Sequence, residues 1–192
     1  MNNVIQTFTG KAFDPMNPDS DLIAIKDIAH ALSNTCRFSG HCKSFYSVAE
    51  HSVRVALLMQ DQAHEVVLAA LLHDASEAYL NDIPTPIKER IPNYQKAEKE
   101  LQRRIFLKFC GDDKCMTPPI KRADLVLLAT EKRDLMVRVE WQWAELPAPL
   151  SYRIEPWRPH IAERNFLWLY DALLGKKTFD HIAEFNINAM IK

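Results

Sequence analysis

The chain has 192 residues, 47% of them hydrophobic and 26% charged, which is enough for one soluble domain with a sizeable core. Its 24 Lys and Arg residues almost balance its 25 Asp and Glu residues, and a net charge of −1 argues against broad binding of nucleic-acid polymers or membrane surfaces. The four glycines lie far apart in the chain, so the glycine-rich loops that bind phosphate in many nucleotide-binding folds are excluded.

Apolar residues recur at helical spacing along most of the chain, and few segments alternate with period two. Helices are predicted in chain order at about residues 21–32, 47–60, 62–79, 92–109, 117–143, 160–174 and 178–190. Polar or proline-rich loops are predicted between them at 34–43, 81–86, 110–116 and 146–159. We expect an all-α fold, a single compact helical domain over residues 1–192 with about six to eight helices.

Two of these helices stand out in the sequence. Ser47-Val-Ala-Glu50 is a capping-box sequence, and it predicts the start of the 47–60 helix. The 62–79 helix is apolar on every side, so we expect it to be the central buried helix.

The four cysteines, Cys36, Cys42, Cys110 and Cys115, are too few for a disulfide scaffold in a chain of this length. Their spacing fits a zinc knuckle poorly, so reduced thiols are the favoured interpretation and a four-cysteine structural zinc site is the alternative. No apolar run approaches the roughly 20 residues of a membrane span, and residues 1–10 lack the pattern of a signal peptide. We therefore expect a cytoplasmic protein that binds no membrane.

The segment with the clearest chemistry ends the most apolar predicted helix and reads His73-Asp74-Ala-Ser-Glu77. Ionisable groups are expensive to bury unless they are paired or bind a metal. Their helical spacing would let all three side chains point into one pocket, where imidazole and carboxylate groups suit a divalent cation. The alternative is a helix end at the surface, where polar residues cost nothing.

Two further residues extend this set. His51 is predicted on the apolar face of the 47–60 helix, and Asp124 lies in another strongly apolar helical segment. With His73 and Asp74 they provide two imidazoles and two carboxylates, enough to hold one metal with positions left for water and substrate. The alternatives are a buried histidine with ordinary partners and an aspartate paired with a neighbouring basic residue.

Four motifs resemble the HD-domain metal-dependent phosphohydrolases, and among them the bacterial 5′-deoxynucleotidases and the viral deoxyadenosine triphosphate triphosphohydrolases. They are Tyr46-Ser-Val-Ala-Glu-His51, His73-Asp-Ala-Ser-Glu77, Asn81-Asp-Ile-Pro-Thr-Pro-Ile-Lys88 and Lys121-Arg-Ala-Asp124, within a motif core of about residues 34–134. The resemblance implies an all-α fold and a metal held by His51, His73, Asp74 and Asp124.

The resemblance also bears on the number of metals. Members with two metals use extra histidines between the HD pair and the last aspartate, and this chain has none from 75 to 123. We therefore expect one divalent metal ion as cofactor, and Co, Mn, Zn, Fe and Ni are all compatible with the ligands.

The same resemblance implies two catalytic carboxyl groups. Glu77 is expected to act as the general base that takes a proton from the attacking water, with orientation of His73 as its alternative role. Asp82 is expected to relay a proton or to protonate the leaving group, with stabilisation of the turn as the alternative.

Substrate binding is expected from Arg37, Phe38, His41 and Lys88. Arg37 can hold a phosphate bidentately and is expected to touch no metal ligand, and Phe38 can pack on a base or sugar. Related deoxynucleotidases often carry Trp at the position of Phe38. His41 and Lys88 are candidate phosphate contacts, with inert surface residues as the alternative.

Two acidic residues that follow Asp124, Glu131 and Asp134, are expected to form ion pairs with Arg133 or Arg138 and to lie outside the site. The function that the resemblance implies is hydrolysis of a 5′-deoxynucleoside monophosphate to deoxynucleoside and phosphate. A deoxynucleoside triphosphate triphosphohydrolase and a non-catalytic nucleotide-binding HD scaffold are the alternatives. The partner is a small-molecule nucleotide, and a homo-oligomer, with a dimer favoured, is expected.

Overall fold

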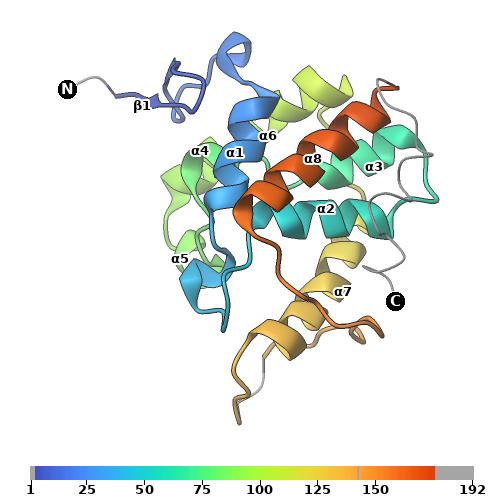
Figure 1. Ribbon diagram of the computed structural model, residues 1–192. Helices are drawn as coiled ribbons and strands as arrows, with labels where there is room; N and C mark the ends of the chain where they lie inside the picture. The colour runs from blue at the N-terminus through green and yellow to red at the C-terminus, as the bar shows by residue number, and fades with distance from the viewer. Residues whose placement is uncertain (1–2, 142, 176–192) are drawn as a thin grey trace.

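The computed structural model describes residues 3–141 and 143–175, and this part of the chain is built from α-helices (Figure 1). The expected all-α fold is confirmed, whereas the helix predicted at 178–190 lies outside the described residues. The helices are α1 Ile25–Asn34, α2 Val48–Leu58, α3 His64–Leu71, α4 Glu77–Leu80, α5 Thr85–Lys88, α6 Pro92–Cys110, α7 Pro118–Leu135 and α8 Pro159–Leu173.

Smaller elements precede and join these helices. A two-stranded antiparallel sheet near the N-terminus pairs β1 (Ile5–Gln6) with β2 (Ala12–Phe13). Short 3-10 turns occur at Ser20–Leu22 and Arg37–Gly40. Among the described residues, no helix combines the length and the apolar character needed to cross a membrane.

Helix α2 lies at the centre of the packing, where α1, α3, α7 and α8 all contact it (Figure 1). Every residue from Val48 to Ala56 is buried, including the polar residues Glu50, His51 and Arg54. The expectation that the 62–79 helix is the central one is therefore wrong, although Val67–Leu71 of α3 is buried as well. Apolar content does not predict the central place of α2, because its buried polar residues are stabilised by specific partners.

The predicted 62–79 helix is also interrupted. Helix α3 ends at Leu71, and residues 72–76 form a turn before the short α4 begins at Glu77. Gln102 of α6 donates from Nε2 to the Leu72 carbonyl at 2.8 Å and accepts from the Ser76 amide at 3.0 Å. These bonds satisfy backbone groups that a continuous helix would have paired internally.

Helix α7 ends at Leu135, earlier than the predicted end at about 143. The chain then turns back along the helix, because Asp134 accepts from the Ile154 amide at 2.9 Å and Thr130 accepts from the Leu150 amide at 2.9 Å. The carbonyl of Leu135 accepts from the Lys43 amide at 2.9 Å. The end of α7 is thus held against the loop that precedes α2.

Candidate active site

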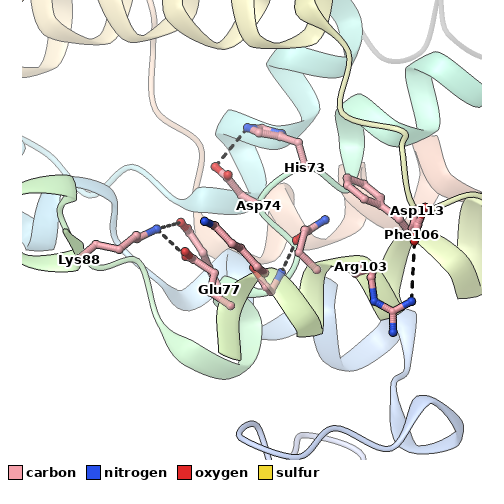
Figure 2. Close-up of a pocket in the computed structure, with 11 residues that line it drawn as sticks. His73, Asp74, Glu77, Lys88, Arg103, Phe106 and Asp113 are labelled. Atoms are coloured by element: carbon pink, nitrogen blue, oxygen red, sulfur yellow. Dashed lines mark hydrogen bonds and ion pairs between the residues drawn. The ribbon is translucent and has the colours of Figure 1, made fainter. Parts of the chain in front are cut away.

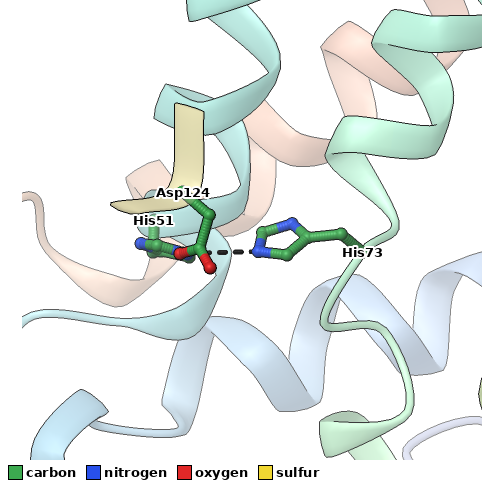
Figure 3. Close-up of side chains that lie close together, drawn as sticks. All are labelled: His51, His73 and Asp124. Carbon is green, nitrogen blue, oxygen red and sulfur yellow. Dashed lines mark hydrogen bonds and ion pairs between the residues drawn. The ribbon is translucent and has the colours of Figure 1, made fainter. Parts of the chain in front are cut away.

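Three side chains from three separate elements meet beneath the surface (Figure 3). His51 comes from α2, His73 from the turn after α3, and Asp124 from α7, and one candidate ligand atom of each lies within 4.8 Å of the others. The Nε2 atom of His51 is 3.3 Å from Nε2 of His73 and 3.2 Å from Oδ1 of Asp124.

Asp74 adjoins this cluster. Its Oδ2 lies 3.2 Å from Nε2 of His73 and 3.7 Å from Nε2 of His51. Donor atoms that share one ion at about 2.0–2.2 Å lie roughly 3–3.5 Å from one another, and the observed spacings are close to this range. The two imidazoles and two carboxylates therefore fit a divalent cation both in chemistry and in spacing.

The outer nitrogens of both imidazoles are already engaged. Nδ1 of His73 donates to the Ala70 carbonyl at 2.8 Å, and Nδ1 of His51 contacts Oε1 of Glu131 at 2.7 Å. Such partners favour a proton on Nδ1, which leaves the Nε2 lone pair directed into the cluster. Metal-binding histidines in proteins are commonly oriented in this way.

Glu131 is a residue that the sequence interpretation assigned wrongly. It does not pair with Arg133 or Arg138, because its side chain is fully buried and contacts His51 and Arg37. Asp134 does pair with Arg133, as predicted. The signal for Glu131 was its spacing: it follows Asp124 by two turns of α7 and so lies on the same helix face.

Arg37 lies between two carboxylates of this region, those of Glu131 and Asp74. Its guanidinium lies 3.2 Å from Glu131 and 3.5 Å from Asp74, so the expectation that it touches no predicted metal ligand is wrong. Burial opposes its charge, but the carboxylates of Glu131 and Asp74 outweigh burial and hold the pKa of Arg37 above its usual value. Its amide donates to the Tyr46 carbonyl at 2.9 Å, which fixes the loop against the start of α2.

Glu77 is buried beside the cluster with Oε2 unpartnered, and its Oε1 is 3.8 Å from Nζ of Lys88. Burial raises the pKa of Glu77 well above its usual value, and the carboxylates of Asp74 and Asp82 add to this rise. Burial also raises the pKa of Asp82. Lys88 itself is held by Glu98, 2.5 Å away (Figure 2).

A cavity of about 640 Å³ gathers most of the predicted site residues on its wall. Seven of them line it, namely Arg37, Phe38, Asp74, Glu77, Asp82, Lys88 and Asp124. His41 is exposed and is not part of this wall. Two tryptophans that the sequence interpretation did not single out, Trp141 and Trp143, also line it.

The fixed charges around this cavity are predominantly negative. Five carboxyl groups, those of Asp74, Glu77, Asp82, Asp124 and Glu131, outnumber the three basic side chains beside them, Arg37, Lys88 and His51. Burial and Arg37 lower the pKa of His51, but Glu131 and Asp124 outweigh them and raise it to about 9. The site therefore attracts positive charge, and a phosphate dianion would meet repulsion there unless a cation were bound.

The four cysteines are not part of the candidate metal-binding group. All four are free thiols, and the candidate metal-binding group among the described residues contains no cysteine. Burial raises the pKa of Cys42 and of Cys110 to about 12, so both remain protonated thiols at neutral pH.

Comparison with known proteins agrees with this geometry. The family described as 5′-deoxynucleotidase YfbR-like matches residues 29–109. A relative from Escherichia coli (strain K12), named "Uncharacterized protein YfdR", is 41% identical over 174 residues, which cover 88% of this chain and 94% of the relative. The chain belongs to the 5′-deoxynucleotidase YfbR-like family.

Other relatives of this YfbR-like chain have names that state an activity. A protein from Photorhabdus temperata named "5'-deoxynucleotidase yfbR" is 34% identical over 77 residues, 31% of this chain and 39% of the relative. A "5'-deoxynucleotidase" from Yersinia pestis (strain Pestoides F) has the same identity and coverage. The family match includes His51, His73 and Asp74 and ends before Asp124.

Proposed function

We propose that this YfbR-like protein is a metal-dependent nucleotide phosphohydrolase that converts 5′-deoxynucleoside monophosphates to deoxynucleosides and phosphate. The observation that carries the proposal is one cavity whose wall combines Asp74 and Asp124, the carboxylates beside the two imidazoles, with Arg37 and with a buried Glu77 whose Oε2 has no hydrogen-bond partner. The names of the relatives that state a 5′-deoxynucleotidase activity support the same substrate class.

A divalent metal would be held by His51, His73, Asp74 and Asp124. When bound, such an ion supplies Lewis-acid polarisation of a phosphoryl oxygen and lowers the pKa of water. It also offsets the excess of carboxylates, so that a phosphate dianion can enter. Arg37 then orients the phosphate through its planar guanidinium, and Lys88 adds a second positive charge.

The remaining steps use groups of the chain itself. Water attacks the phosphorus of the 5′-phosphate, and Glu77 accepts the proton that the water loses. The bond between phosphorus and the 5′-oxygen breaks, and Asp82 donates a proton to that oxygen. The raised pKa of each carboxyl group suits proton transfer near neutral pH. A non-catalytic nucleotide-binding scaffold is disfavoured, because a binding module has no need of a buried free base there.

A second cavity, of about 310 Å³, shares Asp74, Glu77 and Lys88 with the first (Figure 2). Its three cationic side chains, Lys88, Lys99 and Arg103, are outnumbered by four carboxylates, Asp74, Glu77, Glu98 and Asp113. Two of these cations are already paired, Lys88 with Glu98 and Arg103 with Asp113, so the wall offers little free positive charge to the β- and γ-phosphates of a triphosphate. This pairing supports the monophosphate as substrate over the alternative, a deoxynucleoside triphosphate triphosphohydrolase.

The test is a hydrolysis screen of deoxynucleoside mono-, di- and triphosphates with Co²⁺, Mn²⁺, Zn²⁺, Fe²⁺ or Ni²⁺, with products separated by chromatography. We expect free phosphate and deoxynucleoside from the monophosphates. Release of intact triphosphate as the main product would establish the alternative reaction. Asp74→Ala is the matched variant, and it should lose bound metal and turnover together. Full metal content and full turnover in that variant would refute the proposed ligand set.

A further inference from the structure

The segment that follows α7 carries two tryptophans to the wall of the large cavity. Trp141 and Trp143 line it together with Arg37, Asp124 and Leu128. The two indole rings are nearly parallel, with an interplanar angle of 5° and centroids 6.0 Å apart. The cavity therefore has an aromatic wall as well as a charged wall that includes Asp74 and Asp124.

Phe38 connects these two walls. Its ring meets Trp143 edge-on, with centroids 6.4 Å apart, and the guanidinium of Arg37 lies 5.4 Å from the centre of the Phe38 ring. A row of aromatic rings thus runs from Arg37 through Phe38 to Trp143 and Trp141. It begins at the group that is proposed to hold the phosphate and continues away from it.

Two local features suggest that this row serves binding and not packing. Trp141 is 64% exposed, and a large exposed indole on a cavity wall is a common mark of a ligand site. Phe38 has a φ of 56°, in the left-handed region that side chains other than glycine rarely adopt. Such backbone strain is concentrated at functional sites, where it holds a side chain in a defined place.

We propose that Trp141, Trp143 and Phe38, hereafter the aromatic row, bind the nucleobase of the substrate by stacking. The inference rests on the proposed function, because it takes the ligand to be a nucleotide whose phosphate lies at Arg37. Stacking on an aromatic ring accepts every base, since every base has a flat π-face. The site therefore takes all common bases, and purines bind more tightly than pyrimidines because their stacked area is larger.

The first experiment compares two substrates that differ only in the base. Trp143→Ala should lower kcat/KM for deoxyadenosine monophosphate about 5- to 150-fold, the usual range for one stacked base. The same variant should hydrolyse deoxyribose 5-phosphate at the wild-type rate, because this substrate has no base. Trp143→Phe should restore most of the lost activity.

The control for this comparison is Phe8→Ala. Phe8 is also an exposed aromatic residue, 59% exposed, but it stacks on His30 and lines neither cavity. Replacing Phe8 should leave kcat/KM unchanged for both substrates. An equal loss on both substrates in Trp143→Ala would overturn the inference, because the tryptophan would then only support the metal and phosphate site.

The second experiment needs no catalysis. Deoxyadenosine, which carries no phosphate, should quench the intrinsic tryptophan fluorescence of the full chain in the presence of EDTA. The quenching should be lost in Trp141→Phe/Trp143→Ala, which retains Trp157 and Trp168. If the chain hydrolyses no nucleotide yet this quenching is present, the proposed function fails and the base site stands.

Absence of quenching in the wild-type chain would overturn the base site even if hydrolysis is observed. A change of oligomeric state in the tryptophan variants, with deoxyadenosine binding unchanged, would likewise overturn it. The exposed indoles would then belong to an interface between copies of the chain. Sedimentation of the wild type and of the double variant provides that measurement.

Discussion

Both ring nitrogens of His51 contact carboxylates that belong to one helix, α7. Asp124 lies at Nε2 and Glu131 at Nδ1, and the two carboxylates are two turns apart on α7. The imidazole can therefore neither flip nor rotate without losing a charged partner. Resemblance to a family predicted Asp124 from its motif. Glu131 belongs to no motif. Because basic residues such as Arg133 and Arg138 lie near it in the sequence, the sequence alone favours an ion pair with one of them.

Glu131→Gln tests the outer contact. The amide keeps the size of the side chain but removes the charge that orients His51 and Arg37. We expect metal affinity to fall about 10- to 100-fold, the usual effect of removing such a partner. Metal titration followed by calorimetry measures it. Glu163→Gln, which removes an ion pair with His30, is the control and should keep wild-type affinity. Unchanged affinity in Glu131→Gln would mean that His51 is held without this carboxylate.

Lys88→Gln tests the proposed base through pH. A general base acts as its carboxylate, so kcat/KM rises with pH through the pKa of Glu77. Burial sets the raised pKa of Glu77, and Lys88 counters the rise. Removing this cation disfavours the carboxylate, so the acidic limb of the pH profile should move up by about one pH unit.

Lys96→Gln is the control for that profile, and it should leave the acidic limb in place. Lys88 is also proposed to contact phosphate, so the height of the profile is expected to fall as well. A lower kcat/KM at every pH, with the acidic limb unmoved, would separate the effect of Lys88 on the substrate from its effect on Glu77. It would show that Lys88 acts on the substrate alone and that Glu77 does not produce the limb.

At the scale of elements, α2 is held in the core by a buried ion pair. Arg54 donates to Glu50 at 2.8 and 2.9 Å, and the second oxygen of Glu50 accepts from the Trp157 amide at 2.7 Å. The guanidinium also lies 4.9 Å from the centre of the Trp157 ring. The pair thereby joins α2 to the chain segment that leads into α8.

Arg54→Met should be strongly destabilising, because it leaves the buried carboxylate of Glu50 without its cation. We expect the free energy of unfolding to fall by about 3–5 kcal/mol, measured by chemical denaturation. Adding Glu50→Gln should recover part of this loss. Arg103→Met, which breaks an exposed ion pair on α6, should leave the denaturation midpoint almost unchanged. Equal effects of Arg54→Met and Arg103→Met would contradict the role given to the buried pair.

Helix periodicity predicted most elements but not their breaks. The start of α2 agrees with the capping box, since Ser47 accepts from the Glu50 amide at 3.1 Å. The break after Leu71 depends on Gln102, and the end of α7 depends on Ile154 and Leu150. These partners are distant in sequence, so no local pattern around the breaks could have revealed them.

At the scale of the whole molecule, the candidate metal ligands come from α2, the turn after α3 and α7. A cation bound only by the folded chain stabilises it by mass action. At a metal concentration about 100-fold above Kd, we expect Tm to rise by about 5–10 °C. Scanning calorimetry with metal and with EDTA measures this shift. Asp124→Asn should remove most of it, and an undiminished shift would place the metal elsewhere. The homodimer expected from the sequence stays a prediction.

The amide of Gln102 has a further consequence. Its Oε1 accepts from the Ser76 amide and its Nε2 donates to the Leu72 carbonyl. Position 102 therefore uses both a donor and an acceptor, which the planar amide of glutamine supplies together. Glutamate would remove the side-chain donor to the Leu72 carbonyl, which would keep only the Ala75 amide, and lysine would take away the acceptor of the Ser76 amide. Helix α6 supplies no candidate metal ligand, but its Gln102 holds the turn that carries His73 and Asp74. A substitution at position 102 would therefore reach His73 and Asp74 through the backbone of the turn that carries them.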